Sequence, residues 1–407
     1  MRKEHNPKLS SSCATTPACV CRSNEQLTGV PQDLPSNITA LLLDQNWMEA
    51  VHRDNFSRYG SLEYLDLSDN SLSRIDSRTF ANLTNLRRLE LFRNRINSLA
   101  VDAFAGLDNL ETLALSINYF ESLVGTMFAG LGNLVNLYLN GCSISSIQGN
   151  PFALLGNLKV LNLHQNLLTS LSSDMFNGLY SLETLTLDSN KITSIESRTF
   201  YHNGRLKLLS MSENKISTIP DGTFVNQYQI QYILLSKNSI SGAFPVGAFP
   251  TITWWSSVEM GENRMETLPA TAYDKLASFA SAIISDNPWQ CDCRMAPFKQ
   301  KMNGSHAFES QIICAGPASL ADKSLLQNVS VAEMVCAQTA TSPPDATPTA
   351  NSVQGSTSAD SGGSSSTTRG QPEMTQANAG PAIGMSSLLV ILVAFLGKLA
   401  VVPYQWQ

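Results

Sequence analysis

The chain has 407 residues, a formal net charge of −6 and eight cysteines, with 43% hydrophobic and 15% charged residues. The apolar content is too high for a chain that is disordered throughout. The mildly acidic balance argues against a general nucleic-acid-binding protein, which needs a basic surface. This length allows two or three ordinary domains or one extended array of repeats.

The N-terminal segment divides into a polar stretch and a cysteine cluster. Residues 1–12 are polar and charged and lack the apolar core of a secretory signal peptide. In residues 13–36, Cys13, Cys19 and Cys21 precede Val30-Pro31, which we interpret as a cysteine cap. One pairing open to it is Cys13–Cys21 with Cys19 free. Cysteines gathered at a boundary favour an oxidising compartment, so we expect a signal peptide upstream of residue 1.

Residues 37–287 repeat with a period of 24 residues. The copy Leu62-x-x-Leu65-x-Leu67-x-x-Asn70 returns at Leu86-x-x-Leu89-x-Leu91-x-x-Asn94, and eleven copies run from Ile38 to Phe279. Ten copies carry asparagine at the turn position, and Cys142 takes its place in the remaining copy. An aromatic column lies in register, with phenylalanine from Phe56 to Phe249 and then Tyr273. This pattern matches the leucine-rich repeat.

The leucine-rich repeat implies an α/β solenoid, a horseshoe with one short parallel strand per repeat on its concave side. Leu65 and Leu67 are two residues apart, so both point inward from a strand, while Tyr64, Asp66 and Ser68 point outward. Asparagines at the turns would bond backbone groups in a ladder, and the phenylalanines would stack as a spine. One repeat, between Ile240 and Phe249, carries an extra residue that we expect to bulge on the convex side or the rim.

A second cysteine cluster, in residues 288–336, follows the repeats. Asn287-Pro288-Trp289 precedes Cys291 and Cys293, and Cys314 and Cys336 come later. By spacing alone four cysteines allow three connectivities. The arrangement resembles the C-terminal cap of extracellular leucine-rich repeat proteins, which implies the disulfides Cys291–Cys314 and Cys293–Cys336. Zinc binding by these cysteines is disfavoured by the Asn-Pro-Trp run and the secreted context, so we expect no metal site.

The last segments differ in composition from the repeats. Residues 337–380 are rich in Ser, Thr and Pro and predict a disordered, O-glycosylated stalk. Residues 381–407 contain an apolar run broken by Lys398, which allows a transmembrane helix or a GPI-attachment signal. The small residues Asn378-Ala379-Gly380 and the lack of a basic tail favour the lipid anchor, with Asn378 as the attachment residue. Five sequons predict N-glycosylation, at Asn37, Asn55, Asn82, Asn303 and Asn328.

No catalytic, phosphate-binding or metal-binding motif is present, and the five histidines are scattered along the chain. We therefore expect no enzyme and no cofactor, and a concave sheet that serves as a binding platform. Nine acidic and three basic residues occupy the outward positions, which favours a cationic ligand. The candidate ligand-binding residues are Asp66, Glu90, Phe92, Tyr138, His164, Asp188, Glu213, Tyr232, Glu259 and Glu262.

The whole layout resembles lipid-anchored extracellular leucine-rich repeat receptors, above all the variable lymphocyte receptors. The resemblance implies a cell-surface receptor that recognises protein, glycan or microbial-surface ligands on its concave face, with no role for nucleic acid. The Nogo-receptor type, a neuronal or developmental co-receptor, is the second interpretation. A matrix scaffold of the small proteoglycan type is the third, and the anchored tail argues against it.

Overall fold

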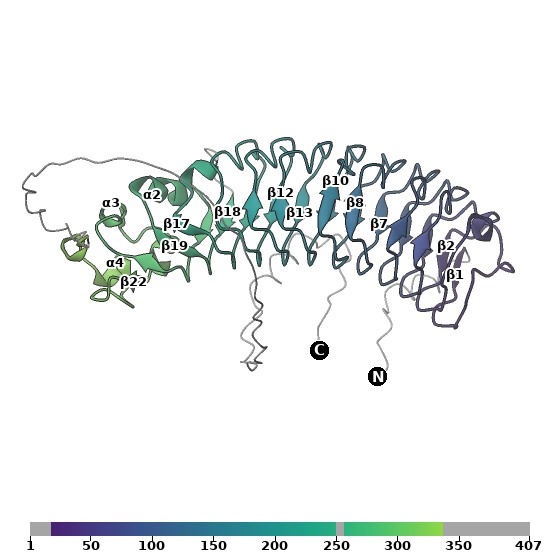
Figure 1. Cartoon of the computed structure of the whole chain (residues 1–407), viewed down its shortest axis with the longest axis horizontal. Coiled ribbons are helices and arrows are strands. Elements are labelled where there is room, and N and C mark those ends of the chain that lie inside the picture. Colours follow the sequence, from purple (N-terminus) through teal and green to yellow (C-terminus); the bar gives the residue numbers. More distant parts are fainter. Residues whose placement is uncertain (1–17, 250–255, 337–407) are drawn as a thin grey trace, which may run out of the picture. The chain divides into compact units, whose positions relative to one another are not determined.

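Each repeat forms one short strand, and the strands stack into a single parallel sheet. The computed structural model describes residues 18–249 and 256–336, and within them the main sheet has twelve strands in chain order (Figure 1). These strands are β1 (Cys19–Cys21), β2 (Ala40–Leu42), β3 (Tyr64–Asp66), β5 (Arg88–Glu90), β7 (Thr112–Ala114), β9 (Asn136–Tyr138), β11 (Val160–Asn162), β13 (Thr184–Thr186), β15 (Leu208–Ser210), β16 (Tyr232–Leu234), β18 (Ser257–Glu259) and β20 (Ser281–Ile283). Leu65 lies opposite Leu89, and Leu89 opposite Leu113, so consecutive turns are in register. The predicted parallel-strand solenoid is confirmed.

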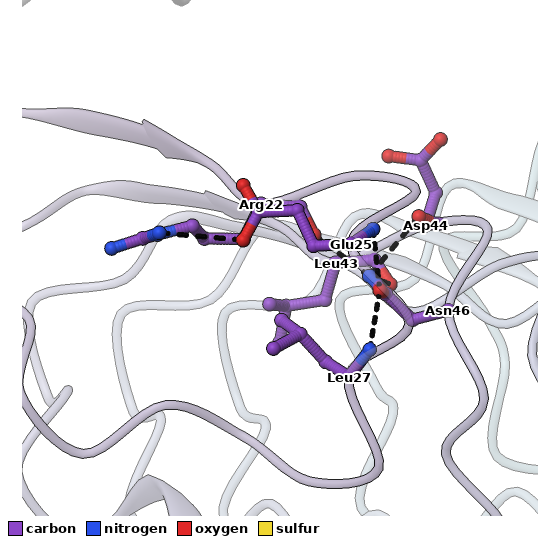
Figure 2. Close-up of polar contacts among 6 residues, drawn as sticks. All are labelled: Arg22, Glu25, Leu27, Leu43, Asp44 and Asn46. Carbon is purple, nitrogen blue, oxygen red and sulfur yellow. Dashed lines mark hydrogen bonds and ion pairs between the residues drawn. The ribbon is translucent and has the colours of Figure 1, made fainter.

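The sheet has one strand more than the eleven predicted, because the N-terminal cap contributes β1. Cys19 pairs with Ala40 and Cys21 with Leu42. Figure 2 shows how Asn46 joins the cap to the first repeat: its Nδ2 donates to the Arg22 carbonyl at 2.7 Å and its Oδ1 accepts from the Leu27 N–H at 2.9 Å. The cap therefore extends the sheet and the asparagine ladder by one turn.

The turn asparagines satisfy backbone groups that the solenoid would otherwise bury without partners. Asn94 is typical: its Oδ1 accepts from the Leu72 N–H at 3.0 Å, and its Nδ2 donates to the carbonyls of Leu67 and Leu91 at 3.0 and 3.1 Å. Cys142 fills this position in its repeat, with Sγ donating to the Leu115 carbonyl at 3.1 Å. Burial raises the pKa of Cys142 to about 12, which keeps the thiol protonated as a donor. The predicted ladder and the cysteine's place in it are confirmed.

The core lies between the main sheet and the convex side. Leu65 and Leu67 are fully buried, and the phenylalanine column from Phe56 to Phe224 is at most 1% exposed. Rings of this column stack at centroid distances of 6.0 Å for Phe128 and Phe152 and 6.1 Å for Phe200 and Phe224. Each added turn thus buries leucines and one aromatic ring against its neighbours, which stabilises the array.

Outside the main sheet, the described residues form turns, short strand pairs and a few short helices, on the convex side and in the C-terminal cap. The paired strands are β4 (Arg74–Ile75) with β6 (Ser98–Leu99), β8 (Ser122–Val124) with β10 (Ser146–Gln148), β12 (Ser170–Leu171) with β14 (Ser194–Ile195), β17 (Ser241–Ala243) with β19 (Arg264–Thr267), and β21 (Trp289–Gln290) with β22 (Cys314–Gly316). The helices are the α-helices α2 (Ala270–Ala277), α3 (Ala296–Lys299) and α4 (Leu325–Asn328) and the 3₁₀ turns η1 (Arg53–Phe56), η2 (Val246–Ala248), η3 (Ala307–Gln311) and η4 (Val331–Glu333). In the described ranges no helix has the length and apolar character needed to cross a membrane.

The irregular repeat is accommodated on the convex side, as predicted. The register between β17 and β19 shifts at Gly242 and Ala243, and η2 follows within the same repeat. Phe249 keeps its place in the aromatic column, with its ring 5.4 Å from that of Phe224. The extra residue is absorbed in the loop, so the strand register of the concave sheet is preserved.

The C-terminal cap closes the last turn of the array. The implied disulfides Cys291–Cys314 and Cys293–Cys336 are both present, with Cα atoms 5.5 and 5.0 Å apart. Gln311 reaches back to the last strand: its Oε1 accepts from the Ile284 N–H at 2.8 Å and its Nε2 donates to the Ala282 carbonyl at 3.0 Å. This side chain takes the place of a next strand at the sheet edge.

The N-terminal cysteine assignment was wrong. Cys19 is disulfide-bonded, whereas Cys21 has a free, exposed thiol. Both belong to β1, where spacing alone does not tell which of two alternate residues reaches another cysteine. Cys13, the stalk of residues 337–380 and the tail with Asn378 lie outside the described residues.

Candidate ligand-binding face

The concave face is formed by the first and third residues of each strand and by the two outward residues of the turn that follows. Ten residues at these positions were predicted to bind a ligand, and the structure assigns them three degrees of exposure. Glu213 and Glu262 are exposed; Phe92, Tyr138, His164, Asp188, Tyr232 and Glu259 are half-buried; Asp66 and Glu90 are buried. Eight of the ten belong to three separate groups along the sheet, and Phe92 and Tyr232 lie outside these groups.

The first group, on β3 and β5, corrects the prediction that Asp66 and Glu90 face a ligand. Asp66 is only 6% exposed and accepts hydrogen bonds from the Tyr64 hydroxyl at 3.1 Å, the Ser68 N–H at 3.0 Å and the Ser68 hydroxyl. Burial raises the pKa of Asp66 to about 7; the hydrogen bonds from Ser68 lower it only in part, and the nearby Glu90 and Asp44 raise it further. Asp66 is thus an internal polar group of the sheet face.

Glu90 is buried by the side chain of Arg88. The Arg88 Nε donates to Glu90 Oε1 at 2.5 Å, and the Arg88 guanidinium lies 5.6 Å from the centre of the Tyr64 ring. Burial raises the pKa of Glu90 despite this ion pair. Tyr138 lies within electrostatic reach of both groups, and its own pKa is raised chiefly by burial. The outermost surface of this group is therefore formed by Arg88, Tyr64 and Tyr138.

The second group, in the middle of the sheet, is a row of hydroxyls and amides. Asn162 accepts from the Thr186 hydroxyl at 2.9 Å and from the His164 N–H at 3.0 Å. Asp188 accepts from the Ser212 N–H at 2.9 Å and from the Ser210 hydroxyl. Burial raises the pKa of Asp188, while these bonds and the nearby His164 act in the opposite direction. The group offers hydroxyl and amide donors and acceptors, with the hydrogen-bonded Asp188 carboxyl among them.

The third group is the acidic end of the face. Glu213 forms an ion pair with Lys237 at 3.6 Å, which neutralises it in part. Glu259, Glu262 and Asp286 follow on the last two turns, and among the residues that the structure describes no basic side chain lies within ion-pair distance of them. Burial raises the pKa of Glu259. Negative charge on the concave face is thus concentrated towards the C-terminal cap.

All three basic residues that the sequence count placed on this face form ion pairs with acidic residues of the same face. Arg93 lies 3.5 Å from Asp69, in addition to the Arg88–Glu90 and Lys237–Glu213 pairs. Along the edge of the sheet, Arg87 pairs with Glu111 at 2.5 Å, and Lys207 pairs with Glu183 at 2.7 Å. The net excess of six acidic residues on the face is unchanged by these pairs, and three of the six, Glu259, Glu262 and Asp286, lie at its C-terminal end.

The sequons lie away from the strands of the sheet. Asn37, Asn303 and Asn328 are exposed, whereas Asn55 and Asn82 are half-buried, and the Asn55 Oδ1 accepts from the His52 N–H at 2.7 Å. None of the five belongs to a strand of the main sheet. Glycans at these positions would leave the concave face open.

The sequence did not reveal two kinds of residue on this face: those that shield buried carboxyls, and those that link the hydroxyl and amide row by hydrogen bonds. Tyr64 and Arg88 shield Asp66 and Glu90, and Asn162, Thr186 and Ser210 connect the middle strands. Each of these residues occupies an outward strand position, so the repeat alignment located them. The repeat alignment did not show that the long side chains of Tyr64 and Arg88 would cover neighbouring carboxyls. Within the described part of the chain no group of histidine, cysteine or carboxylate side chains could hold a metal ion.

Comparison with known proteins identifies the repeat. The leucine rich repeat model matches residues 36–96, 84–144, 132–192 and 180–240, which together span half of the chain. The chain belongs to the leucine-rich repeat family. Toll-like receptor 3 of Mus musculus is 44% identical over 54 residues, 13% of this chain and 6% of that protein. This leucine-rich repeat chain therefore matches only a small part of that relative.

Solved leucine-rich repeat structures share the fold along most of the chain. The mouse RP105/MD-1 complex is similar with a TM-score of 0.65 and 23% identity, covering 77% of this chain and 54% of that one. A complex of Latrophilin 3, Unc5D and FLRT2 (LRR) is similar with a TM-score of 0.52 and 23% identity, covering 76% of this chain and 96% of that one. These similarities show a shared leucine-rich repeat fold.

Proposed function

We propose that the protein is a non-enzymatic cell-surface receptor that binds a protein ligand on the concave face of its sheet. The observation that carries this proposal is the face itself: twelve strands present half-buried Phe92, Tyr138 and Tyr232 beside a fixed polar row. Aromatic side chains that are partly exposed and rigidly held suit protein interfaces. The similar RP105 and FLRT2 structures are complexes with other proteins, which supports a protein ligand.

The type of ligand follows from the three groups. The hydroxyl and amide row suits hydrogen bonds to backbone or sugar groups, and the acidic end suits a basic segment. We propose that a cationic part of the ligand contacts Glu259 and Glu262, in place of the wider acidic surface expected from the sequence. We propose recognition of foreign or microbial surfaces as the role of this face. Adhesion or guidance between host cells is the second candidate role.

Attachment to the membrane completes the proposal. A lipid anchor at Asn378, with the stalk of residues 337–380 as a spacer, would hold the array away from the bilayer. The concave face would then be available to ligands from solution or from another surface.

The test presents the soluble array to panels of microbial cells, glycans and host ectodomains. For each binder found, the double variant Glu259→Gln/Glu262→Gln should lower the association rate several-fold, and the effect should shrink in 1 M salt. Glu266→Gln, the same change on the exposed convex strand β19, is the matched control and should have no effect. A ligand whose association rate responds equally to the control would place its site elsewhere.

A further inference from the structure

A strained apolar residue lies on the flank of the array, at the edge of the concave face. In each repeat the residue before the turn asparagine has a positive φ, a conformation that glycine, asparagine and aspartate tolerate best. Ten other repeats place residues without a branched Cβ at this position: Gln45, Asp69, Arg93, Gly141, Gln165, Ser189, Glu213, Lys237, Glu262 and Asp286. Ile117, with φ of 56°, is the β-branched member of the set.

Burial does not compensate for the strain at Ile117. Its side chain is 42% exposed, and the adjacent turn places Gly141 beside it, so no larger side chain covers it from that side. A β-branched residue in this conformation is destabilising for the fold. Strain that is retained at an exposed apolar position points to a contact that the isolated chain does not make.

Ile117 is one of two exposed apolar residues on its turn, and two exposed charged residues accompany them. Tyr119 is two residues further on and 62% exposed. Arg95, 24 residues earlier, occupies the position on the preceding turn that corresponds to Tyr119. The two turns are adjacent, since the Tyr119 N–H donates to the Ile96 carbonyl at 2.9 Å. Glu121 follows Tyr119 by two residues on the same turn. Both charged side chains are exposed, and within the described ranges neither forms an ion pair.

We propose that this flank patch, formed by Arg95, Ile117, Tyr119 and Glu121, binds the same patch on a second copy of the chain. In a two-fold interface each residue meets its counterpart's neighbours reciprocally. A two-fold axis beside Tyr119 would bring Arg95 of each copy opposite Glu121 of the other, and would stack Ile117 and Tyr119 of both copies at the centre. The patch is thus complementary to itself in charge and in apolar character.

The size of the patch sets the strength of the association. Specific complexes bury about 800 Å² on each partner, and an apolar centre of two residues is small by that measure. We expect a weak dimer in solution, which becomes populated where copies are concentrated on one membrane. This association leaves the strands of the concave face open, and Ile117 at the rim of the face lies several repeats away from Glu259 and Glu262 of the proposed ligand site.

The experiment measures self-association of the full chain in mild detergent by analytical ultracentrifugation. Arg95→Glu and Glu121→Arg should each weaken the dimer at least tenfold, and the double reversal should restore it to within about threefold. Tyr119→Ser should weaken it at least tenfold, whereas Tyr228→Ser, at a convex tyrosine that is 74% exposed, should leave it unchanged. Ile117→Gly should weaken the dimer while raising the melting temperature, so a folding defect cannot account for the loss.

Three results would overturn the proposal. The wild-type chain could remain monomeric up to high micromolar concentration. The double reversal could fail to recover the association that the single reversals lose. Finally, Tyr228→Ser could weaken the dimer as much as Tyr119→Ser, which would assign the contact to the convex side. None of these results bears on ligand binding by the concave face.

Discussion

Replacing Asp66 by asparagine should stabilise the protein above neutral pH and destabilise it in acid. Asp66 is buried under Tyr64 and accepts from Ser68, yet its pKa is about 7 in the folded chain. In the unfolded chain an aspartate titrates near pH ~3.9. The folded state therefore holds the proton more tightly, and stability that is fully present below pH ~4 is lost as the pH rises through about 7.

The size of the effect follows from the difference between the two pKa values. About three pH units at ~1.36 kcal/mol each correspond to roughly 4 kcal/mol at pH 8. The Asp66→Asn variant would recover about half of this, roughly 2 kcal/mol, because the amide must still be buried and one of its N–H groups lacks an acceptor. The amide oxygen can keep the bonds from Ser68.

Urea denaturation followed by circular dichroism at pH 4 and pH 8 measures this difference. Asp66→Asn should exceed the wild type by roughly 2 kcal/mol at pH 8 and fall below it by roughly 2 kcal/mol at pH 4, because the amide does not titrate and its burial costs the same at both pH values. Asp108→Asn, an exposed aspartate of the convex side, is the control and should change neither value. If Asp66→Asn destabilises the protein equally at both pH values, the carboxyl is charged and well solvated, and the burial argument is refuted.

Three further predictions concern the turns, the cap and the anchor. Gly178→Ala should lower the unfolding free energy by roughly 2–3 kcal/mol, because φ is 92° and the new Cβ would lie 2.6 Å from the Ala153 carbonyl oxygen; Gly132→Ala, where no atom lies within 4 Å of the new Cβ, should be neutral in the same urea titration. Gln311→Ala should speed hydrogen exchange at Ile284 by removing the acceptor of its N–H, whereas exposed Gln300→Ala should not; equal rates in all three proteins would show that Gln311 does not cap the sheet. Phosphatidylinositol-specific phospholipase should release the protein from expressing cells, and Asn378→Leu should abolish this release; full retention of the wild type on the cells would favour a transmembrane span.

The sequence was sufficient for the features that depend on a regular period. Spacing of 24 residues placed Leu65 and Leu67 in the core, the asparagines in a ladder and Cys142 in that ladder, because each column repeats the same environment. The C-terminal disulfides followed from a family resemblance. These features are local or depend only on the neighbouring turn at the same position.

Features that depend on how one side chain extends over its neighbours could not be predicted from the sequence. Arg88 and Tyr64 bury Glu90 and Asp66 by lying across adjacent positions, and the outward strand pattern assigns all four residues to solvent. Gln311 has no repeat counterpart, so no column identifies it as the group that completes the sheet edge. The choice between Cys19 and Cys21 depends on how the chain before β1 turns, which two cysteines at alternate positions do not reveal.

A glycan placed on the sheet tests the central claim most directly. His164→Thr makes Asn162, on the middle strand β11, an acceptor for N-glycosylation. Val135→Thr does the same for exposed Asn133, which precedes β9 outside the main sheet and whose amide donates to the Asp108 carbonyl at 2.8 Å. If the concave face binds the ligand, the glycan at Asn162 should abolish binding, its enzymatic removal should restore most of it, and the glycan at Asn133 should have no effect. Undiminished binding with a fully occupied glycan at Asn162 would contradict the account.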